Sequence, residues 1–77
     1  MHKPIYVHAE WDPEAKVWFA ESRDVPGLVT EASTVELLMQ KLAVMIPEML
    51  EANGADVPAD TAFELLARRF EMARPAA

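Results

Sequence analysis

Cysteine is absent from this sequence of 77 residues, and histidine occurs only twice. Without cysteine the chain forms no disulfide and offers no thiolate ligand for zinc, and two histidines are too few for a histidine-rich metal site. A domain of this size buries only about 60% of the surface that its unfolded chain exposes, so its stability is marginal. We therefore expect no cofactor and no metal, and we expect good packing or oligomerisation to stabilise the fold.

Positive charge is also scarce, because 7 lysine and arginine residues stand against 13 acidic residues, which gives a formal net charge of -6. This balance opposes the counterion release that drives nucleic-acid binding, so no direct contact with nucleic acid is expected. An acidic surface favours a basic protein partner, although the same charge also serves solubility alone.

Long hydrophobic runs are missing too, because none approaches the roughly 18 residues that cross a bilayer. The first residues lead directly into a strand pattern rather than a signal peptide. We therefore expect a cytoplasmic protein with no membrane partner. Hydrophobic residues make up 52% of the chain and charged residues 26%, which is a globular composition. The length predicts a single domain spanning residues 1–77.

The first half of the chain has the pattern of short strands joined by turns. Apolar and polar residues alternate over residues 5–12, and residues 12–15 then predict a type I turn through their aspartate and proline. A second strand is expected over residues 16–22, with large apolar side chains on both of its faces. This two-sided pattern indicates that the second face of the sheet is also covered by something.

Structural turn and cap residues follow the second strand. Pro26 fixes φ and Gly27 takes the positive φ of a type II turn, and a short strand is expected at residues 28–32. Ser33 and Glu36 then have the spacing of a capping box, in which each side chain accepts a hydrogen bond from the backbone N–H of the other residue.

An amphipathic helix is predicted from Thr34 to about Asn53, with Gly54 as the left-handed residue just past its end. Pro47 lies inside it on the polar side, where we expect one bent helix rather than two. Leu37 and Val44 interrupt the polar side, either as ordinary surface residues or as a contact seam.

The segment from Ala62 to Ala73 is ambiguous. Its glutamate, leucine, alanine and arginine content favours a helix, whereas a strand there would cover an open edge of the sheet.

The chain combines, in order, a strand that ends in Trp11-Asp12, the run of residues 17–22, the turn and strand of residues 24–32, and the helical segment 45–54. With Glu36-Leu37-Leu38 and Phe63-Glu64-Leu65, this succession resembles the bacterial DUF1902 family, which is itself similar to the HicB antitoxin group. The resemblance implies an α+β fold of order β-β-β-α-β, a small antiparallel sheet with one helix packed across one face. It also implies a final strand in the tail, and homodimers or larger assemblies.

HicB proteins neutralise small, basic HicA toxins that cleave messenger RNA, and they usually carry an extra DNA-binding segment. No helix-turn-helix or ribbon-helix-helix pattern occurs in these 77 residues, so the resemblance does not extend to DNA binding.

No catalytic constellation stands out in the sequence. His8 has no serine or cysteine nucleophile motif beside it, and we interpret it as a surface histidine. Acidic residues instead gather on the strands and turns of the first half, where they are the candidate contacts for a basic partner: Glu10, Asp12, Glu21, Asp24 and Glu31.

The leading hypothesis is a non-enzymatic, HicB-like protein-binding module that homodimerises through the uncovered sheet face or the tail strand and binds a small basic protein. The alternative is a stand-alone structural or small-ligand-binding homo-oligomer with no toxin partner. Binding of duplex RNA is a third hypothesis, based on a fold-level likeness alone.

Overall fold

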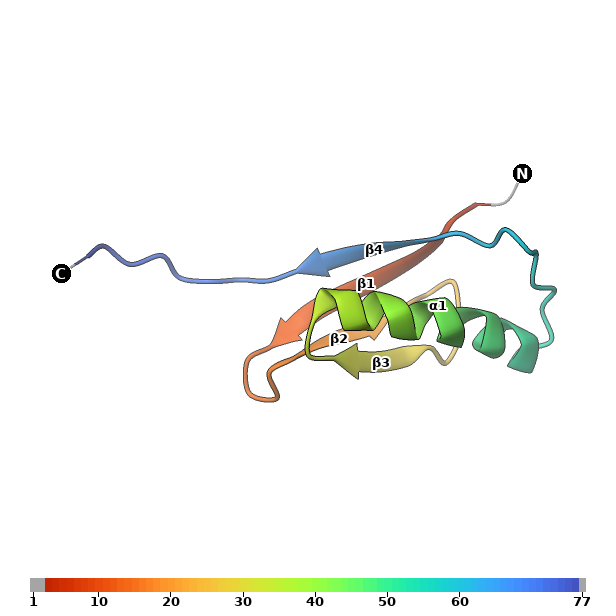
Figure 1. The fold of residues 1–77 in the computed structure, drawn as a ribbon, viewed down its shortest axis with the longest axis horizontal. Helices are drawn as coiled ribbons and strands as arrows, with labels where there is room; N and C mark the ends of the chain where they lie inside the picture. Colours follow the sequence, from red (N-terminus) through yellow and green to blue (C-terminus); the bar gives the residue numbers. More distant parts are fainter. Residues whose placement is uncertain (1–2, 77) are drawn as a thin grey trace.

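Four strands and one helix follow one another in the computed structural model, which describes residues 3–76. They are β1 (Ile5–Asp12), β2 (Val17–Glu21), β3 (Val29–Ala32), α1 (Val35–Ala52) and β4 (Phe63–Arg68). The helix lies on one side of the sheet, and no element of the described chain covers the other side (Figure 1). This arrangement confirms the α+β fold of order β-β-β-α-β, and it confirms a strand in the C-terminal segment.

The sheet has the order β3-β2-β1-β4, and its pairing differs from the expectation in one respect. β1–β2 and β2–β3 are antiparallel, but β4 is parallel to β1, so the sheet is mixed rather than wholly antiparallel. The reason is the helix, which returns the chain to the end of the sheet where β1 begins. A strand that starts there runs in the direction of β1.

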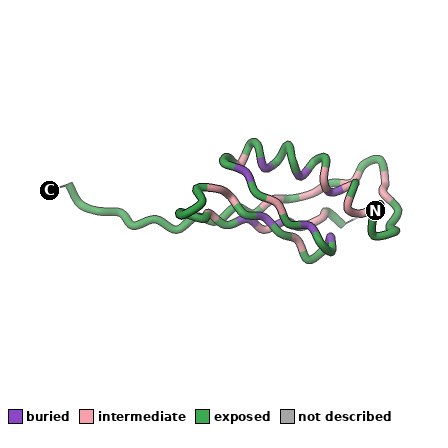
Figure 2. The backbone as a smooth tube through the Cα atoms, turned by 90° about the horizontal axis from the view of Figure 1, so that it is seen from below, coloured by how far each residue is buried: buried purple, intermediate pink, exposed green. Residues whose placement is uncertain are grey.

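The core lies between the helix and the inner face of the sheet, where Figure 2 shows the buried residues. Helix α1 contributes Leu38, Leu42 and Ile46, which are four residues apart and therefore share one side of the helix. The buried residues of the sheet are small and let the helix approach closely: Val7, Ala9, Ala20 and Ala32. Larger side chains of the sheet are partly buried and pack against this core: Ile5, Trp18, Phe63 and Leu65. Burial of each large apolar side chain stabilises the fold by about 1.5–3 kcal/mol.

The loop between β1 and β2 is held by Asp12, as the sequence predicts. Its Oδ1 accepts hydrogen bonds from the backbone N–H groups of Glu14 (3.0 Å) and Ala15 (3.2 Å). Lys16 ends the loop with a φ of 58°, and its N–H donates to the Asp12 carbonyl at 2.7 Å. This left-handed residue lets the chain reverse into β2.

The second turn has the predicted type II form. The Leu28 N–H donates to the Val25 carbonyl at 3.1 Å, and Gly27 has a φ of 85°. A Cβ at Gly27 would lie 3.0 Å from the Cε of Met49, so the glycine also permits a close approach of the helix. Asn53 at the end of α1 donates from Nδ2 to the Pro26 carbonyl at 2.9 Å, which ties the turn to the helix.

The helix start is one residue later than the predicted capping box. Thr34 is the N-cap, and its hydroxyl accepts a hydrogen bond from the Leu37 N–H at 3.1 Å. The predicted box between Ser33 and Glu36 is therefore wrong, because Glu36 falls inside the first turn instead of at the third helical position. Glu36 still places negative charge at the positive end of the helix dipole.

The helix end is as predicted. Gly54 has a φ of 77°, its N–H donates to the Glu51 carbonyl, and the Ala55 N–H donates to the Leu50 carbonyl, which together form a Schellman motif. The helix continues through Pro47 as a single element. Of the described residues, no helix is both long and apolar enough to span a membrane.

Candidate protein-binding face

The face of the sheet turned away from α1, the outer face, carries large apolar side chains that nothing within the described chain covers. Residues of β1 alternate between the two faces, so that Val7 and Ala9 are fully buried against the helix while Tyr6, His8 and Glu10 point outward. Each of the four strands contributes one exposed apolar side chain to the outer face: Tyr6 (46% exposed), Phe19 (42%), Val29 (52%) and Leu66 (50%).

The strand registers align the outer-face side chains in two rows that cross the sheet. The first row is Leu66, His8, Glu21 and Val29. The second row is Arg68, Glu10, Phe19 and Glu31. Directly opposed side chains on neighbouring strands lie within contact distance of each other. Phe19 therefore stands between Glu10 and Glu31, and carboxylates are interleaved with apolar side chains across the face.

The structure divides the five predicted acidic contacts into two groups. Glu10, Glu21 and Glu31 lie together on the outer face and are exposed. Asp12 and Asp24 have structural roles instead. The Asp12 carboxylate holds the first loop, and Asp24 Oδ2 accepts a hydrogen bond from the Tyr6 N–H at 2.8 Å.

Sequence reasoning missed a fourth acid of the outer face, Glu64, which pairs with Tyr6 across β4 and β1. The sequence feature that places Glu64 on this face is the alternation of residues 63–68 between the two sides of the strand. This alternation indicates an outer-face position only if the segment is a strand, and its composition also favours a helix.

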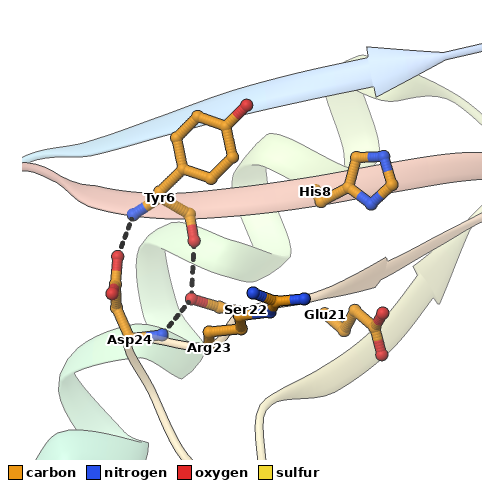
Figure 3. Close-up of a pocket in the computed structure, with 6 residues that line it drawn as sticks. All are labelled: Tyr6, His8, Glu21, Ser22, Arg23 and Asp24. Carbon is orange, nitrogen blue, oxygen red and sulfur yellow. Dashed lines mark hydrogen bonds between the residues drawn. The ribbon is translucent and has the colours of Figure 1, made fainter.

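A shallow hollow of about 550 Å³ opens at the end of the outer face where β2 stops. Figure 3 shows its six lining residues, with the helix behind the sheet: Tyr6, His8, Glu21, Ser22, Arg23 and Asp24. The Ser22 hydroxyl donates to the Tyr6 carbonyl at 2.6 Å and accepts from the Asp24 N–H at 3.1 Å. Because β2 ends at Glu21, the backbone of Tyr6 is bonded by the side chains of Ser22 and Asp24 instead of by a strand.

Serine, histidine and aspartate share this hollow, but their hydrogen bonds run elsewhere. Ser22 and Asp24 bond the backbone of Tyr6, whereas His8 Nε2 lies 3.9 Å from Glu10 Oε1. Between residues 3 and 76, no three or more histidine, aspartate or glutamate side chains are grouped to hold a metal ion. The outer face thus presents exposed apolar side chains together with carboxylates.

Leu37 and Val44 border a second hollow of about 510 Å³, between α1 and the end of β3. Both are exposed, as are the polar residues Gln40 and Lys41 beside them. Lys41 Nζ donates to the Glu31 carbonyl at 2.6 Å, so its cation lies on this side of β3. A cation at this hollow makes it a weaker candidate than the outer face for a basic partner.

The fold and the outer face define a class, small α+β proteins in which one helix covers a four-stranded sheet and the opposite face is open and acidic. A family model described as a domain of unknown function, DUF1902, matches residues 4–76. The chain belongs to the DUF1902 family.

The crystal structure of the hypothetical protein TTHA1013 from the extremely thermophilic bacterium Thermus thermophilus is similar to this chain. The two are 49% identical with a TM-score of 0.77, over 97% of this chain and 99% of that one. A comparison with curated proteins found no match.

Proposed function

We propose that this chain is a non-enzymatic, HicB-like protein-binding module whose outer face binds a small basic protein. The observation that carries the proposal is the placement of Glu10, Glu21 and Glu31 on one face, among exposed apolar side chains from every strand. The HicB resemblance of the sequence supports a HicA-type ribonuclease toxin as the partner. Such a toxin acts on messenger RNA, so the role is cytoplasmic.

The apolar and charged groups have different parts in this binding. Tyr6 and Phe19 are the aromatic anchors, because aromatic side chains buried at the centre of an interface supply most of its binding energy. The surrounding carboxylates steer a basic partner toward the face and disfavour acidic proteins. No cofactor is required for either part.

Charge reversal on the outer face tests the proposal. The ligand is a short basic protein encoded beside the gene, titrated against the wild type and against a Glu10→Lys, Glu21→Lys, Glu31→Lys variant. We expect the triple variant to bind at least about 100-fold more weakly. A lower association rate constant should account for much of this loss. A Glu48→Lys variant is the control, because Glu48 is an exposed acid on the helix.

Equal binding by the triple variant and the wild type would contradict the outer face as the binding site. Rescue of growth when the chain is co-expressed with the basic protein would support the antitoxin role. If no such reading frame lies beside the gene and no candidate toxin is neutralised, the antitoxin role is abandoned.

The second candidate is a small-ligand-binding homo-oligomer, and the hollow beside Tyr6 favours it. Its volume of about 550 Å³ lies within the range of small-molecule sites, and Arg23 and His8 offer polar contacts. A thermal-shift screen separates the two roles, since a ligand at 100 times its dissociation constant stabilises the fold by about 2.7 kcal/mol. A stabilising compound whose effect disappears in a Tyr6→Ala variant would favour this candidate.

A further inference from the structure

Residues 69–76 form an extended arm that continues the direction of β4 beyond the end of β1 (Figures 1 and 2). Phe70 is 83% exposed and Met72 is 70% exposed on this C-terminal arm. Of the hydrogen bonds among the described residues, none ties residues 70–76 to the rest of the chain. Two large apolar side chains are therefore held away from any surface of their own chain.

β4 is an edge strand, and its outer edge is open. The Ile5 N–H donates to the Ala62 carbonyl at 2.8 Å. This bond fixes the phase of the parallel ladder, that is, which residues of β4 bond to β1 and which point to the open edge. In that phase the even-numbered residues of β4 bond to β1, and Phe63, Leu65 and Ala67 direct their N–H and C=O groups to the open edge. An unpaired edge of this kind is a template for another strand.

The arm begins with the alternation of β4. The Arg69 guanidinium lies 4.2 Å from the centre of the Trp11 ring, on the helix side of the sheet. Continued alternation brings Phe70, Met72 and Arg74 to the side of the outer face, in line with Leu66.

Charge separates the arm from the rest of the chain. Residues 69–76 contain two arginines and one glutamate, a net charge of +1, whereas residues 1–68 contain 5 basic and 12 acidic residues, a net charge of -7. The arm is thus complementary in charge to the surface of another copy.

We propose that β4 and the C-terminal arm pair in antiparallel fashion with the same segment of a second copy, about a two-fold axis at Arg69. In this register Met72 lies opposite Leu66 of the second copy, and Arg74 lies opposite Glu64. Phe70 lies opposite Arg68. The odd-numbered residues from Leu65 to Ala73 then bond to one another across the open edges, which matches the phase of the ladder, and Pro75, which has no N–H, ends the pairing.

The two Arg69 side chains meet at the axis without an uncompensated repulsion. Each guanidinium stacks on Trp11 of its own chain, and its Nη2 lies 3.8 Å from Glu71 Oε1. The two four-stranded sheets become one sheet with β3 at both ends, and the two outer faces become continuous. This inference is independent of the basic partner proposed above.

Disulfide trapping tests the register, because the chain has no cysteine of its own and every cross-link reports the position introduced. Directly opposed, hydrogen-bonded residues of antiparallel strands have Cα atoms about 5.5 Å apart, within the range that a disulfide spans. We expect Arg69→Cys to form a cross-linked dimer under mild oxidation, and the exposed helix position Val44→Cys to remain monomeric. A cross-linking maximum at another arm position overturns this register, and equal cross-linking of both variants overturns the pairing.

Sedimentation equilibrium tests the association itself. We expect a wild-type mass of twice 8.6 kDa, and a loss of affinity of at least about tenfold in a Phe70→Glu, Met72→Glu variant. The matched control is Leu37→Glu, Val44→Glu, which places the same charges on the helix hollow and should leave the mass unchanged. A wild type that is monomeric at about 100 μM, or a dimer lost only in the helix variant, overturns the proposal. Far-UV circular dichroism verifies that both variants fold.

Discussion

The two faces of the sheet carry apolar side chains of different fate. The inner face presents Ala9, Ala20 and Ala32, which are 0% to 7% exposed beneath α1, and larger side chains such as Trp18 and Leu65 also pack against the core. The outer face presents Tyr6 and Phe19, which are more than 40% exposed. Small residues on the inner face let the helix pack closely, so that face stabilises the fold, whereas the large residues of the outer face gain their full burial only against another molecule.

The largest effect on stability should come from the inner side. Leu42 is fully buried at the centre of the helix, and Leu42→Ala should lower the free energy of unfolding by about 2–5 kcal/mol through lost burial and a residual cavity. Urea denaturation measures the change. Val44→Ala, two residues further on and 59% exposed, is the control and should change stability by less than about 0.5 kcal/mol.

The turn between β2 and β3, which Asn53 ties to the end of the helix, should give the next largest effect. Gly27 has a φ of 85° and faces Met49, whereas Gly54 has a φ of 77° with open space around it. Gly54→Ala should cost about 1–2 kcal/mol from the left-handed conformation alone. Gly27→Ala should cost more than this, because Met49 must also be displaced. Equal losses in thermal unfolding would mean that the Met49 contact contributes nothing.

A smaller effect separates the two neighbouring candidates for the helix cap. Thr34→Ala removes the hydroxyl that accepts from the Leu37 N–H and should cost about 1 kcal/mol. Ser33→Ala should change the free energy of unfolding by less than about 0.5 kcal/mol. The reverse order would restore the capping box that begins at Ser33.

The smallest effect on stability belongs to the outer face. Val29→Thr keeps the shape and β-propensity of an exposed side chain, so the free energy of unfolding should change by less than about 0.5 kcal/mol. The same substitution should still weaken binding of the basic partner, because it places a hydroxyl in the apolar part of the interface. A variant that loses stability but binds unchanged would reverse the roles of the two faces.

Local signals predicted the elements that their own residues determine. Pro26 and Gly27 gave the type II turn, Gly54 gave the helix end, and the helical periodicity of residues 34–53 gave α1. The cap was misplaced because Ser33 and Thr34 are both good N-cap residues, and only the backbone at Thr34, extended at φ -134° and ψ 158°, decides between them.

Features that depend on distant partners were not predictable in this way. The composition of residues 62–73 favours a helix, but the pairing of β4 with β1 overrides it, and the parallel direction follows from where α1 ends. The positions of the five acidic residues were predictable only in part for the same reason. Glu10, Glu21 and Glu31 follow from strand alternation, whereas the bond of Asp24 to Tyr6 joins residues 18 apart and leaves no local pattern.

The most direct test of the outer face as the binding site is a backbone amide NMR titration of the chain with the neighbouring basic protein. We expect chemical-shift changes concentrated on β1, β2 and β3, strongest around Glu10, Phe19 and Glu31. Changes concentrated along α1 around Leu37 and Val44, with the outer-face strands unperturbed, would contradict it.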